Sequence, residues 1–339
     1  GELADRKDYL GGETINTVYL GGGTPSQLEK DDFTNIFKTI YDNYSVNPNA
    51  EITIEANPDD LTDGYVKMLS TLPFNRLSMG IQTFNDDILS LLKRRHNAQQ
   101  AIEAFGRCRN AGFRNISIDL MYGLPGESMD TWNKDLDTAI SLAPEHISAY
   151  HLIYEEGTAL YKLREEKKVS EADEDLSNSL FETLISRLKE NGYVHYEISN
   201  FCRPGMHSRH NSSYWTGIKY LGCGPSAHSY DGHSRQWNIS SLDKYIEGIN
   251  KGSNISEIEE LDLYTRYNDF VITSIRTAWG MPLDKLKAEY GNALYDYCLK
   301  MAHPHISQGT LEIKDNTLKL TQSGIFISDG IMSDMLWVE

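Results

Sequence analysis

Apolar and polar positions in the first 155 residues follow two alternating patterns. Short runs of β-forming apolar residues recur about every 30 residues, and amphipathic stretches with helical spacing separate them. Because strands that alternate with helices at this interval form a parallel sheet, the pattern predicts an α/β fold, either a barrel or a doubly wound sheet. The predicted strands cover 17–20, 52–56, 76–82, 115–121 and 146–152, and the predicted helices 27–44, 62–72, 85–95, 98–111 and 129–142.

The pattern changes after residue 155. Residues 155–172 are charged and predict a surface excursion, which a helix over 173–191 and a strand over 193–201 follow. Residues 207–215 and 221–228 are rich in histidine, glycine and aromatic residues without periodicity, which is typical of a binding loop.

The last 80 residues or so predict a separate structure. Three helical segments precede two short strands that flank the turn Asp315-Asn316-Thr317. Helices followed by a hairpin resemble a winged helix, so an α+β domain is expected there. The helices are predicted over 262–279, 283–290 and 292–303, the strands over 311–314 and 318–321, and the domains over 1–155, 156–240 and 241–339.

Charge narrows the set of partners. The chain carries a net charge of −17, which argues against nucleic acid and anionic membrane surfaces as ligands. Residues 261–339 hold seven basic and ten acidic residues, a net charge of −3, whereas a DNA-reading wing is normally basic. We therefore expect this domain to be a cap or lid.

The cysteines and the N-terminal residues indicate in which cellular compartment the protein is expected. Cys108, Cys202, Cys223 and Cys298 lie far apart without C-x-x-C spacing, which indicates reduced thiols in a cytoplasmic protein. No apolar run reaches the roughly 18 residues of a membrane span, and no signal peptide is visible. Because residues 1–10 resemble the end of a helix, we expect further sequence upstream.

One glycine-rich stretch, Thr17 to Pro25, stands out. A short apolar strand enters three consecutive glycines, Gly21 to Gly23, whose main-chain N–H groups a ligand can approach closely. Ser26 and Glu29 have the spacing of a capping box and predict the start of a helix. On local grounds this is a phosphate-type loop, or only a tight strand-to-helix corner.

Chemically active residues recur where the predicted strands end. In a βα barrel the carboxyl ends of the strands form one mouth, where active sites are built. These residues would therefore converge, although edge residues that meet solvent are the alternative. They are Gly21 to Gly23, Glu55, Gln82, Asp119 and His151.

Four segments together resemble the radical S-adenosylmethionine (SAM) superfamily, specifically its oxygen-independent coproporphyrinogen III oxidase-like branch. The likeness covers most of residues 15–230 and implies a partial (βα)6 TIM-like barrel that binds SAM beside a [4Fe-4S] cluster. The segments are Gly21-Gly22-Gly23-Thr24-Pro25, Ile54-Glu55-Ala56-Asn57-Pro58, Asn75 to Phe84 and Ile118 to Gly126.

The resemblance implies roles for seven residues at the mouth. The glycine loop would contact the methionine end of SAM, and Glu55 would bind the ribose or a second SAM. Arg94 has an alternative reading, because Lys93-Arg94-Arg95 is also typical of a solvated basic turn. The implied SAM contacts are Gly22, Gly23, Thr24, Glu55, Gln82, Arg94 and Asp119.

The segment His210-Asn211-Ser212-Ser213-Tyr214-Trp215 fits the H-N-x-x-Y-W motif of the haem chaperones within this branch. His210 would then be a haem-iron ligand, and Tyr214 and Trp215 would offer flat apolar surface to the porphyrin. Alternatively the segment only packs the lid on the barrel, and Cys223 and His228 are the nearby alternative ligands.

The chain departs from the family in one respect. The C-x-x-x-C-x-x-C cluster motif and the first barrel strand that precedes it do not occur here. None of the four cysteines can replace the motif at that spacing, so this chain holds no predicted ligands for the cluster. The resemblance therefore implies that the first strand and the cluster ligands lie upstream of residue 1.

Two functions follow from the resemblance. The first is a haem-binding chaperone that uses SAM and a [4Fe-4S] cluster and passes haem to a membrane haemoprotein. The second is an oxygen-independent oxidase that decarboxylates the propionates of coproporphyrinogen III. We expect a cytoplasmic protein, peripheral to the membrane in the first case, that does not bind nucleic acid; its oligomeric state and its catalytic activity stay open.

Overall fold

The computed structural model describes residues 1–338, which divide into two compact units. Residues 17–34 and 51–208 form one, named here the sheet unit, and residues 1–16, 35–50 and 209–339 form the other, named the terminal unit. The domain boundaries predicted near residues 155 and 240 stay a prediction.

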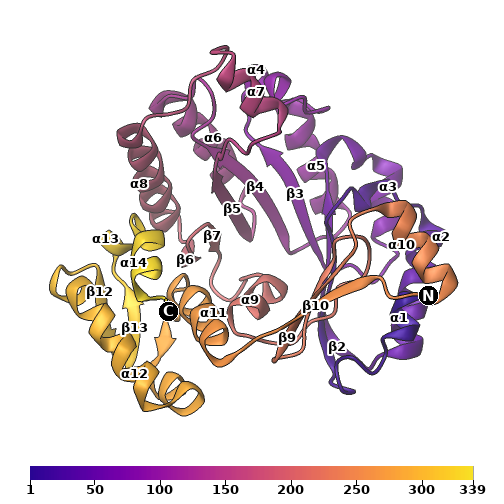
Figure 1. Cartoon of the computed structure of the whole chain (residues 1–339). Coiled ribbons are helices and arrows are strands. Elements are labelled where there is room, and N and C mark those ends of the chain that lie inside the picture. The colour runs from indigo at the N-terminus through magenta and orange to yellow at the C-terminus, as the bar shows by residue number, and fades with distance from the viewer. Residues whose placement is uncertain (339) are drawn as a thin grey trace. The chain divides into compact units, whose positions relative to one another are not determined.

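The largest sheet within residues 1–338 has seven strands in the order β1-β2-β3-β4-β5-β7-β6 (Figure 1). Strands β2 to β5 pair in parallel, whereas β7 is antiparallel to both β5 and β6. The strands are β1 (Ile15–Leu20), β2 (Val46–Ala56), β3 (Arg76–Gln82), β4 (Ile116–Tyr122), β5 (His146–His151), β6 (Val194–Glu197) and β7 (Asn200–Cys202).

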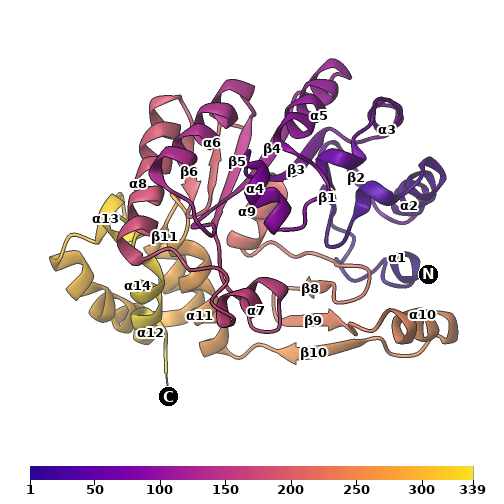
Figure 2. The same ribbon diagram turned by 90° about the horizontal axis from the view of Figure 1, so that it is seen from above.

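Helices cover one side of this sheet. Figure 2 shows α3, α5, α6 and α8 along the outer side of the curved strands. The helical elements from residue 25 to residue 190 are η1 (Pro25–Gln27), α2 (Lys30–Asn43), η2 (Pro58–Asp60), α3 (Asp63–Leu69), α4 (Asp86–Leu91), α5 (Ala98–Asn110), α6 (Met129–Leu142), α7 (Ala159–Glu165) and α8 (Glu174–Glu190).

The apolar residues of the strands explain this layering. Successive side chains of a strand point to opposite faces, and Ile54, Met79 and Ile118 are fully buried. In the helical layer, Trp132 of α6 is also fully buried, and its indole N–H donates to the carbonyl of Leu180 in α8 at 3.0 Å. The predicted alternation of strand and helix is thus confirmed, with β3 and α6 at their predicted bounds.

Two predictions near the start of the sheet are wrong. Ser26 does not cap a helix, because Pro25 to Gln27 form the 3-10 turn η1 and α2 begins only at Lys30. The Ser26 hydroxyl instead donates to Asp60 at 2.6 Å. In addition, the strand predicted over 52–56 begins earlier, since β2 already starts at Val46.

The strand predicted over 193–201 is a hairpin. β6 and β7 pair with each other, and Glu197 lies opposite Asn200. The Glu197 carboxylate accepts hydrogen bonds from the Ser199 N–H at 3.1 Å and from the Asn200 side-chain amide at 2.5 Å. These bonds stabilise a tight turn that the apolar pattern does not reveal.

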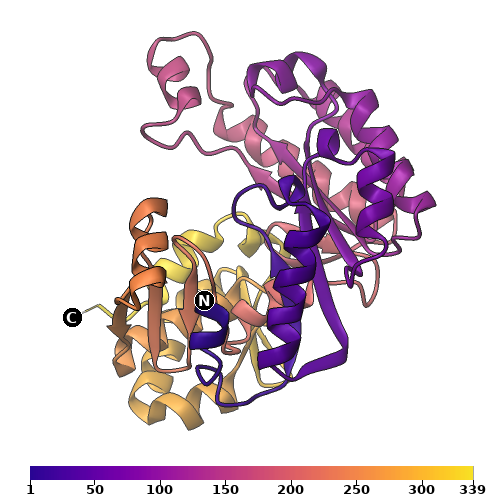
Figure 3. The same ribbon diagram turned by 90° about the vertical axis from the view of Figure 1, so that its right-hand side faces the viewer.

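The charged segment 155–172 is the surface excursion that the sequence predicts. It carries α7 and stands out from the rest of the sheet unit in Figure 3. Leu160 and Tyr161 of α7 pack on a small cluster of Leu124, Leu152 and Tyr154. Packing on this cluster holds the excursion at the ends of β4 and β5.

The terminal unit contains a three-stranded sheet in the order β10-β9-β8, whose strands lie side by side in Figure 2. The buried Glu2 carboxylate links the first helix to this part of the chain, because it accepts from the Gly224 N–H at 2.8 Å and from the Asn238 amide at 2.7 Å. The elements are α1 (Glu2–Asp5), α9 (Arg209–Trp215), β8 (His228–Tyr230), β9 (Ser234–Asn238), α10 (Leu242–Lys251) and β10 (Ser256–Glu260).

The C-terminal part has the predicted helices and hairpin. The two helices predicted on either side of Gly291 are present within α12, where Gly291 itself is not helical (φ 80°, ψ 175°) and kinks the element. Asp315 and Asn316 both have positive φ, as a two-residue hairpin turn requires. The elements are α11 (Leu263–Ile275), β11 (Met281–Pro282), α12 (Leu283–Ser307), β12 (Leu311–Lys314), β13 (Thr317–Leu320), α13 (Gln322–Ile325) and α14 (Ser328–Met335).

Across residues 1–338, each helix falls short of the length and apolar character that crossing a lipid bilayer demands.

Candidate functional site

The inner face of the large sheet, away from the helices, carries a row of polar side chains. Strand alternation places them there, because their neighbours in sequence are the buried apolar residues of the outer face. The pairing register sets Glu55 beside Ser78 and Asp119 beside Ser148. The row therefore runs across four neighbouring strands.

The glycine loop lies against this row at Glu55. The Tyr19 hydroxyl donates to Glu55 Oε1 at 2.6 Å, and the Gly22 N–H donates to Oε2 at 3.3 Å. A Cβ on Gly21 would lie 2.5 Å from the Tyr19 ring and 2.8 Å from the Glu55 carboxylate. Gly21 is therefore required by close approach rather than by backbone conformation.

The next two glycines are required for a different reason. Gly22 and Gly23 have φ values of 70° and 155°, which side-chain-bearing residues rarely adopt. No heavy atom lies within 4 Å of the Cβ position at either residue, and both residues are exposed, as is Thr24. The loop thus presents main-chain atoms to open space.

Gln82 and Arg94 lie over Gly80 at the end of β3. A Cβ on Gly80 would be 3.0 Å from Gln82 Nε2 and 3.4 Å from Arg94 Nη2. Gln82 has a φ of 75° and follows an irregularity in the pairing of β3 with β4, which directs its side chain back over the strand.

Arg94 is not part of a solvated turn. Its Nη2 donates to Asn57 Oδ1 at 2.7 Å and to the Gly80 carbonyl at 2.8 Å. Within the described residues its Nε is buried without a hydrogen-bond partner, and burial lowers the pKa of the guanidinium. The side chain therefore keeps one donor that a ligand could use.

Asp119 lies on the inner face between Ser78 and Ser148. Burial raises the pKa of Asp119 to about 6, and the charge of Glu55 acts in the same direction. Hydrogen bonds from Ser148 and Ser78, the latter at 3.3 Å, oppose the shift. Asp119 and Glu55 are thus electrostatically linked, as a shared site requires.

His151 occupies the end of β5 but its ring is engaged by the protein. Its Nε2 lies 3.0 Å from the Ser177 hydroxyl, and the ring packs edge-on against Tyr122 at 5.2 Å. A Cβ on Gly123 would lie 2.7 Å from the same nitrogen. These contacts assign His151 a packing role at the strand end.

Sequence reasoning missed Tyr19, Ser78 and Ser148. Each stands on the inner face of its strand and contacts Glu55 or Asp119. In a strand, side chains two residues apart point to the same face. The alternation within each strand is therefore the signal that could have identified these three residues as inward-facing.

The H-N-x-x-Y-W segment forms helix α9 and not the irregular loop that its composition predicts. One helical turn sets His210 beside Tyr214, with Nε2 2.9 Å from the tyrosine hydroxyl and ring centroids 5.3 Å apart. Burial lowers the pKa of His210 to about 4, so its imidazole is neutral at physiological pH. Tyr214 also packs edge-on against Tyr220 at 4.8 Å.

The other residues considered with His210 have different surroundings. Trp215 lies under the Arg276 guanidinium at 4.2 Å, and its indole N–H is buried with no hydrogen-bond partner in the part of the chain that is described. Cys223 is a free, exposed cysteine. His228 is exposed and packs on Trp237 at 6.2 Å.

The described residues contain no set of ligands for a metal cluster. Of the four free cysteines, Cys108, Cys202 and Cys298 are buried and Cys223 is exposed. No group of three or more His, Cys, Asp or Glu side chains in residues 1–338 is arranged to hold a metal ion. These residues therefore do not fit a [4Fe-4S] cluster.

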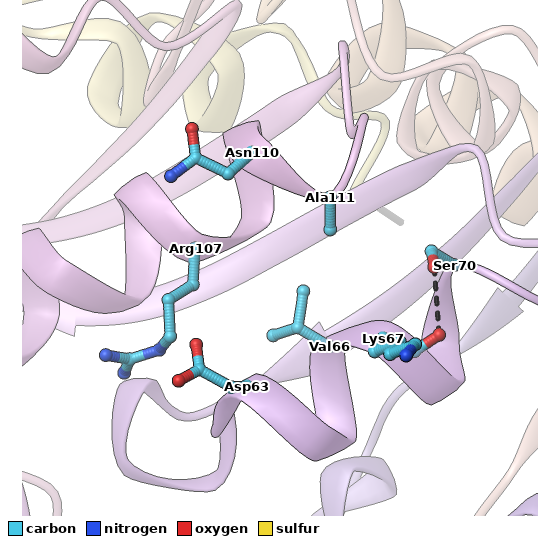
Figure 4. A pocket seen from close by; sticks show the side chains of 7 residues that line it. All are labelled: Asp63, Val66, Lys67, Ser70, Arg107, Asn110 and Ala111. Atoms are coloured by element: carbon cyan, nitrogen blue, oxygen red, sulfur yellow. Dashed lines mark hydrogen bonds between the residues drawn. The ribbon is translucent and has the colours of Figure 1, made fainter.

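A hollow of about 260 Å³ lies between α3 and α5 (Figure 4). Lys67 and Arg107 line it together with Asp63, and Arg107 Nε already donates to the Leu61 carbonyl at 2.8 Å. The hollow belongs to the helical layer and contains none of the seven predicted SAM contacts. Its lining residues are Asp63, Val66, Lys67, Ser70, Arg107, Asn110 and Ala111.

The raised pKa of Asp119 gives stability a pH dependence. The folded protein holds this proton more tightly than the unfolded chain, so the contribution of Asp119 to the free energy of unfolding falls as the pH rises from about 4 to about 6. Wild type should therefore lose stability relative to Asp119→Asn over this range. Urea unfolding of both proteins at several pH values measures the difference.

The matched control is Asp130→Asn, whose side chain is exposed on α6. It removes a carboxyl group from the helical layer and leaves the inner face of the sheet unchanged. A pH-independent difference between wild type and Asp119→Asn would show that the Asp119 carboxyl titrates alike in the folded and unfolded states.

Comparison with known proteins connects this site to a family. The model of the radical SAM superfamily matches residues 2–139, and that of the HemN C-terminal domain matches residues 261–327. The solved structure of coproporphyrinogen III oxidase (HemN) from Escherichia coli superposes with a TM-score of 0.84, covering 98% of this chain and 80% of that one. At 22% identity this likeness shows a shared fold.

Curated relatives match along nearly the whole chain. Heme chaperone HemW from Bacillus subtilis is 31% identical over 99% of this chain and 89% of its own length. Heme chaperone HemW from Mycobacterium tuberculosis is 32% identical over 99% of this chain and 84% of its own length. With the radical SAM fold and the inner-face site in place, this similarity shows that the chain belongs to the HemW family of the radical SAM superfamily.

Proposed function

We propose that this chain is a haem chaperone that binds SAM at the inner face of the large sheet and haem at helix α9. The observation that carries the proposal is the neutral, partly buried His210 imidazole paired with the Tyr214 hydroxyl. The relatives that match nearly the whole chain bear the name heme chaperone, which supports haem as the cargo.

Helix α9 has the chemistry that haem requires. A neutral imidazole offers a nitrogen lone pair to iron, and the pKa of about 4 keeps His210 in this form. Tyr214 is 37% exposed, so its ring can meet a porphyrin face. Because Nε2 already contacts the Tyr214 hydroxyl, iron and this hydroxyl would compete for the same nitrogen, and such competition favours a cargo that can be released.

Two observations support SAM as the ligand of the inner face. The exposed glycine loop brings main-chain atoms beside open space at Gly22 and Gly23, and Arg94 keeps a buried donor without a partner among the described residues. Main-chain donors and a guanidinium suit a carboxylate, and a carboxylate such as Asp119 suits an ammonium group.

The remaining predicted contacts complete this binding mode. Glu55 would bind the ribose hydroxyls of SAM or contact a second SAM molecule, and Thr24 would join the glycine loop at the methionine end. Gln82 lies above Gly80 beside Arg94, where its amide could reach the same ligand. When bound, SAM would supply a cationic sulfonium; the family also uses a [4Fe-4S] cluster, for which the described residues provide no ligands and no step is derived.

The partner that would receive haem is, in this proposal, a membrane haemoprotein, which would bring the cytoplasmic chain to a membrane surface. The oxidase that decarboxylates coproporphyrinogen III has no observation of its own to favour it. The likeness to that enzyme, at 22% identity, concerns the fold.

Haem binding tests the α9 site. Titration of the protein with haem should produce a Soret band, and His210→Ala should weaken haem binding at least about tenfold because the iron ligand is lost. Tyr214→Phe should bind haem at least as well as wild type, since it keeps the ring and frees Nε2 from the hydroxyl. Absorption spectra over the titration measure both effects.

His228→Ala is the matched control, because it removes an exposed histidine that also packs on an aromatic ring. It should bind haem like wild type. If His210→Ala matched wild type while His228→Ala lost binding, the haem site would lie at His228 and not on α9.

SAM binding tests the glycine loop. Gly21→Ala should weaken SAM binding about tenfold, because the new Cβ would displace Tyr19 or Glu55 from the loop. Gly64→Ala is the matched control, since the Cβ position of this α3 residue has no atom within 4 Å. Titration calorimetry with SAM measures both affinities, and equal affinities of Gly21→Ala and wild type would remove the loop from the SAM site.

A further inference from the structure

Asp60 lies at the end of η2, directly after the strand that carries Glu55. Its carboxylate side chain is only 8% exposed. Asp60 is not among the ligand contacts predicted from the sequence. Both carboxylate oxygens accept hydrogen bonds from other loops. The donors are the Ser26 hydroxyl at 2.6 Å, the Gln27 amide at 2.5 Å, Arg95 Nη2 at 3.0 Å and, more weakly, the Asn57 amide at 3.4 Å.

These donors come from the three loops that present the proposed SAM contacts. Ser26 follows Thr24 by two residues, Asn57 follows Glu55 by two residues, and Arg95 is the direct neighbour of Arg94. A displacement of any donor would therefore move a ligand-contacting residue in the same loop.

Further bonds close the network around Asp60. Asn57, which donates to Asp60, accepts from Arg94 Nη2 through its Oδ1 at 2.7 Å. Arg95 also pairs with Asp59 at 2.9 Å. His96 donates from Nε2 to the Ile81 carbonyl at 3.2 Å, so the same loop is also tied to β3 next to Gln82.

The hydrogen bonds around Asp60 can order the exposed glycine loop. The loop of Gly22 to Thr24 is exposed, and no atom lies within 4 Å of the Cβ positions of Gly22 and Gly23 to hold it from outside. A loop that must be ordered when a ligand arrives lowers the affinity, whereas a loop already held in place does not. Because protein donors occupy both oxygens of Asp60, this carboxylate acts on a ligand only through its neighbours.

We propose that Asp60 is a positioning residue, which holds the loops of Gly22 to Thr24, Glu55 and Arg94 in one arrangement before SAM binds. This inference rests on the proposed SAM site. It adds a residue that has no ligand contact of its own and whose partners lie up to 35 residues away in sequence.

The test measures loop order and SAM affinity separately. Asp60→Ala should raise amide hydrogen exchange at residues 22–27 and 93–96 about tenfold in the protein without SAM, and should weaken SAM binding about tenfold. Ser26→Ala keeps Asp60 and removes the hydrogen bond that the Ser26 hydroxyl donates to it. It should nevertheless raise exchange at residues 93–96, because Asp60 connects the two loops. In the double variant the Ser26 change should add nothing to the Asp60 change.

Asp137→Ala is the matched control, because it breaks another aspartate–arginine pair of the sheet unit, with Arg187. It should leave exchange at both segments and SAM affinity unchanged. Unchanged exchange at residues 22–27 and 93–96 in both Asp60→Ala and Ser26→Ala would overturn the proposal. If Asp60→Ala does not fold, hydrogen exchange of Ser26→Ala and Arg95→Gln tests the proposal instead. If the wild-type protein does not bind SAM, the proposed function is wrong, and the exchange data still test whether Asp60 orders the loops.

Discussion

The site depends on the close approach of the glycine loop to Glu55. Gly21 leaves no room for a Cβ between Tyr19 and the Glu55 carboxylate, and the carboxylate in turn accepts from the Tyr19 hydroxyl and the Gly22 N–H. A main chain at this distance places the next two glycines at the inner face with open space around them. The charge of Glu55 then acts on Asp119, two strands further along the sheet.

The sheet can carry these charges because its polar side chains lie on the face opposite to the helices of the sheet unit (Figure 2). Apolar residues such as Ile54 and Met79 fill the helix-covered face, while the inner face offers hydroxyl groups as partners for carboxylates. Buried charges are tolerated only where hydrogen bonds or opposite charges compensate them. Tyr19, Ser78, Ser148 and the Asp60 network supply this compensation, and they leave Arg94 with a donor unused by the described residues.

Much of the fold could be predicted from local pattern, because strands and helices of the sheet unit carry strong periodicity and clear caps. β3 and α6 have the predicted bounds. The failures lie where a distant contact decides the local structure. Ser26 has the spacing of a helix cap but donates to Asp60, 34 residues away, and no local pattern contains this contact.

The candidate site divides in the same way. The roles of Glu55, Gln82, Arg94 and Asp119 stay predictions from the resemblance, and the structure places Glu55 close to Asp119 and Gln82 close to Arg94. Tyr19 and Ser78 were missed, since each is an ordinary strand residue whose meaning comes from its neighbour across the sheet. The α9 segment was expected as a loop because its polar and aromatic composition hides the helical spacing of His210 and Tyr214.

Amide hydrogen exchange of the wild-type protein, with and without SAM, tests the central claim most directly. We expect SAM to protect the amides of Gly22, Gly23 and Thr24 more strongly than those of any other loop, because all three residues are exposed and Gly22 lies against Glu55. Protection that leaves these three amides unchanged and appears elsewhere in the chain would contradict it.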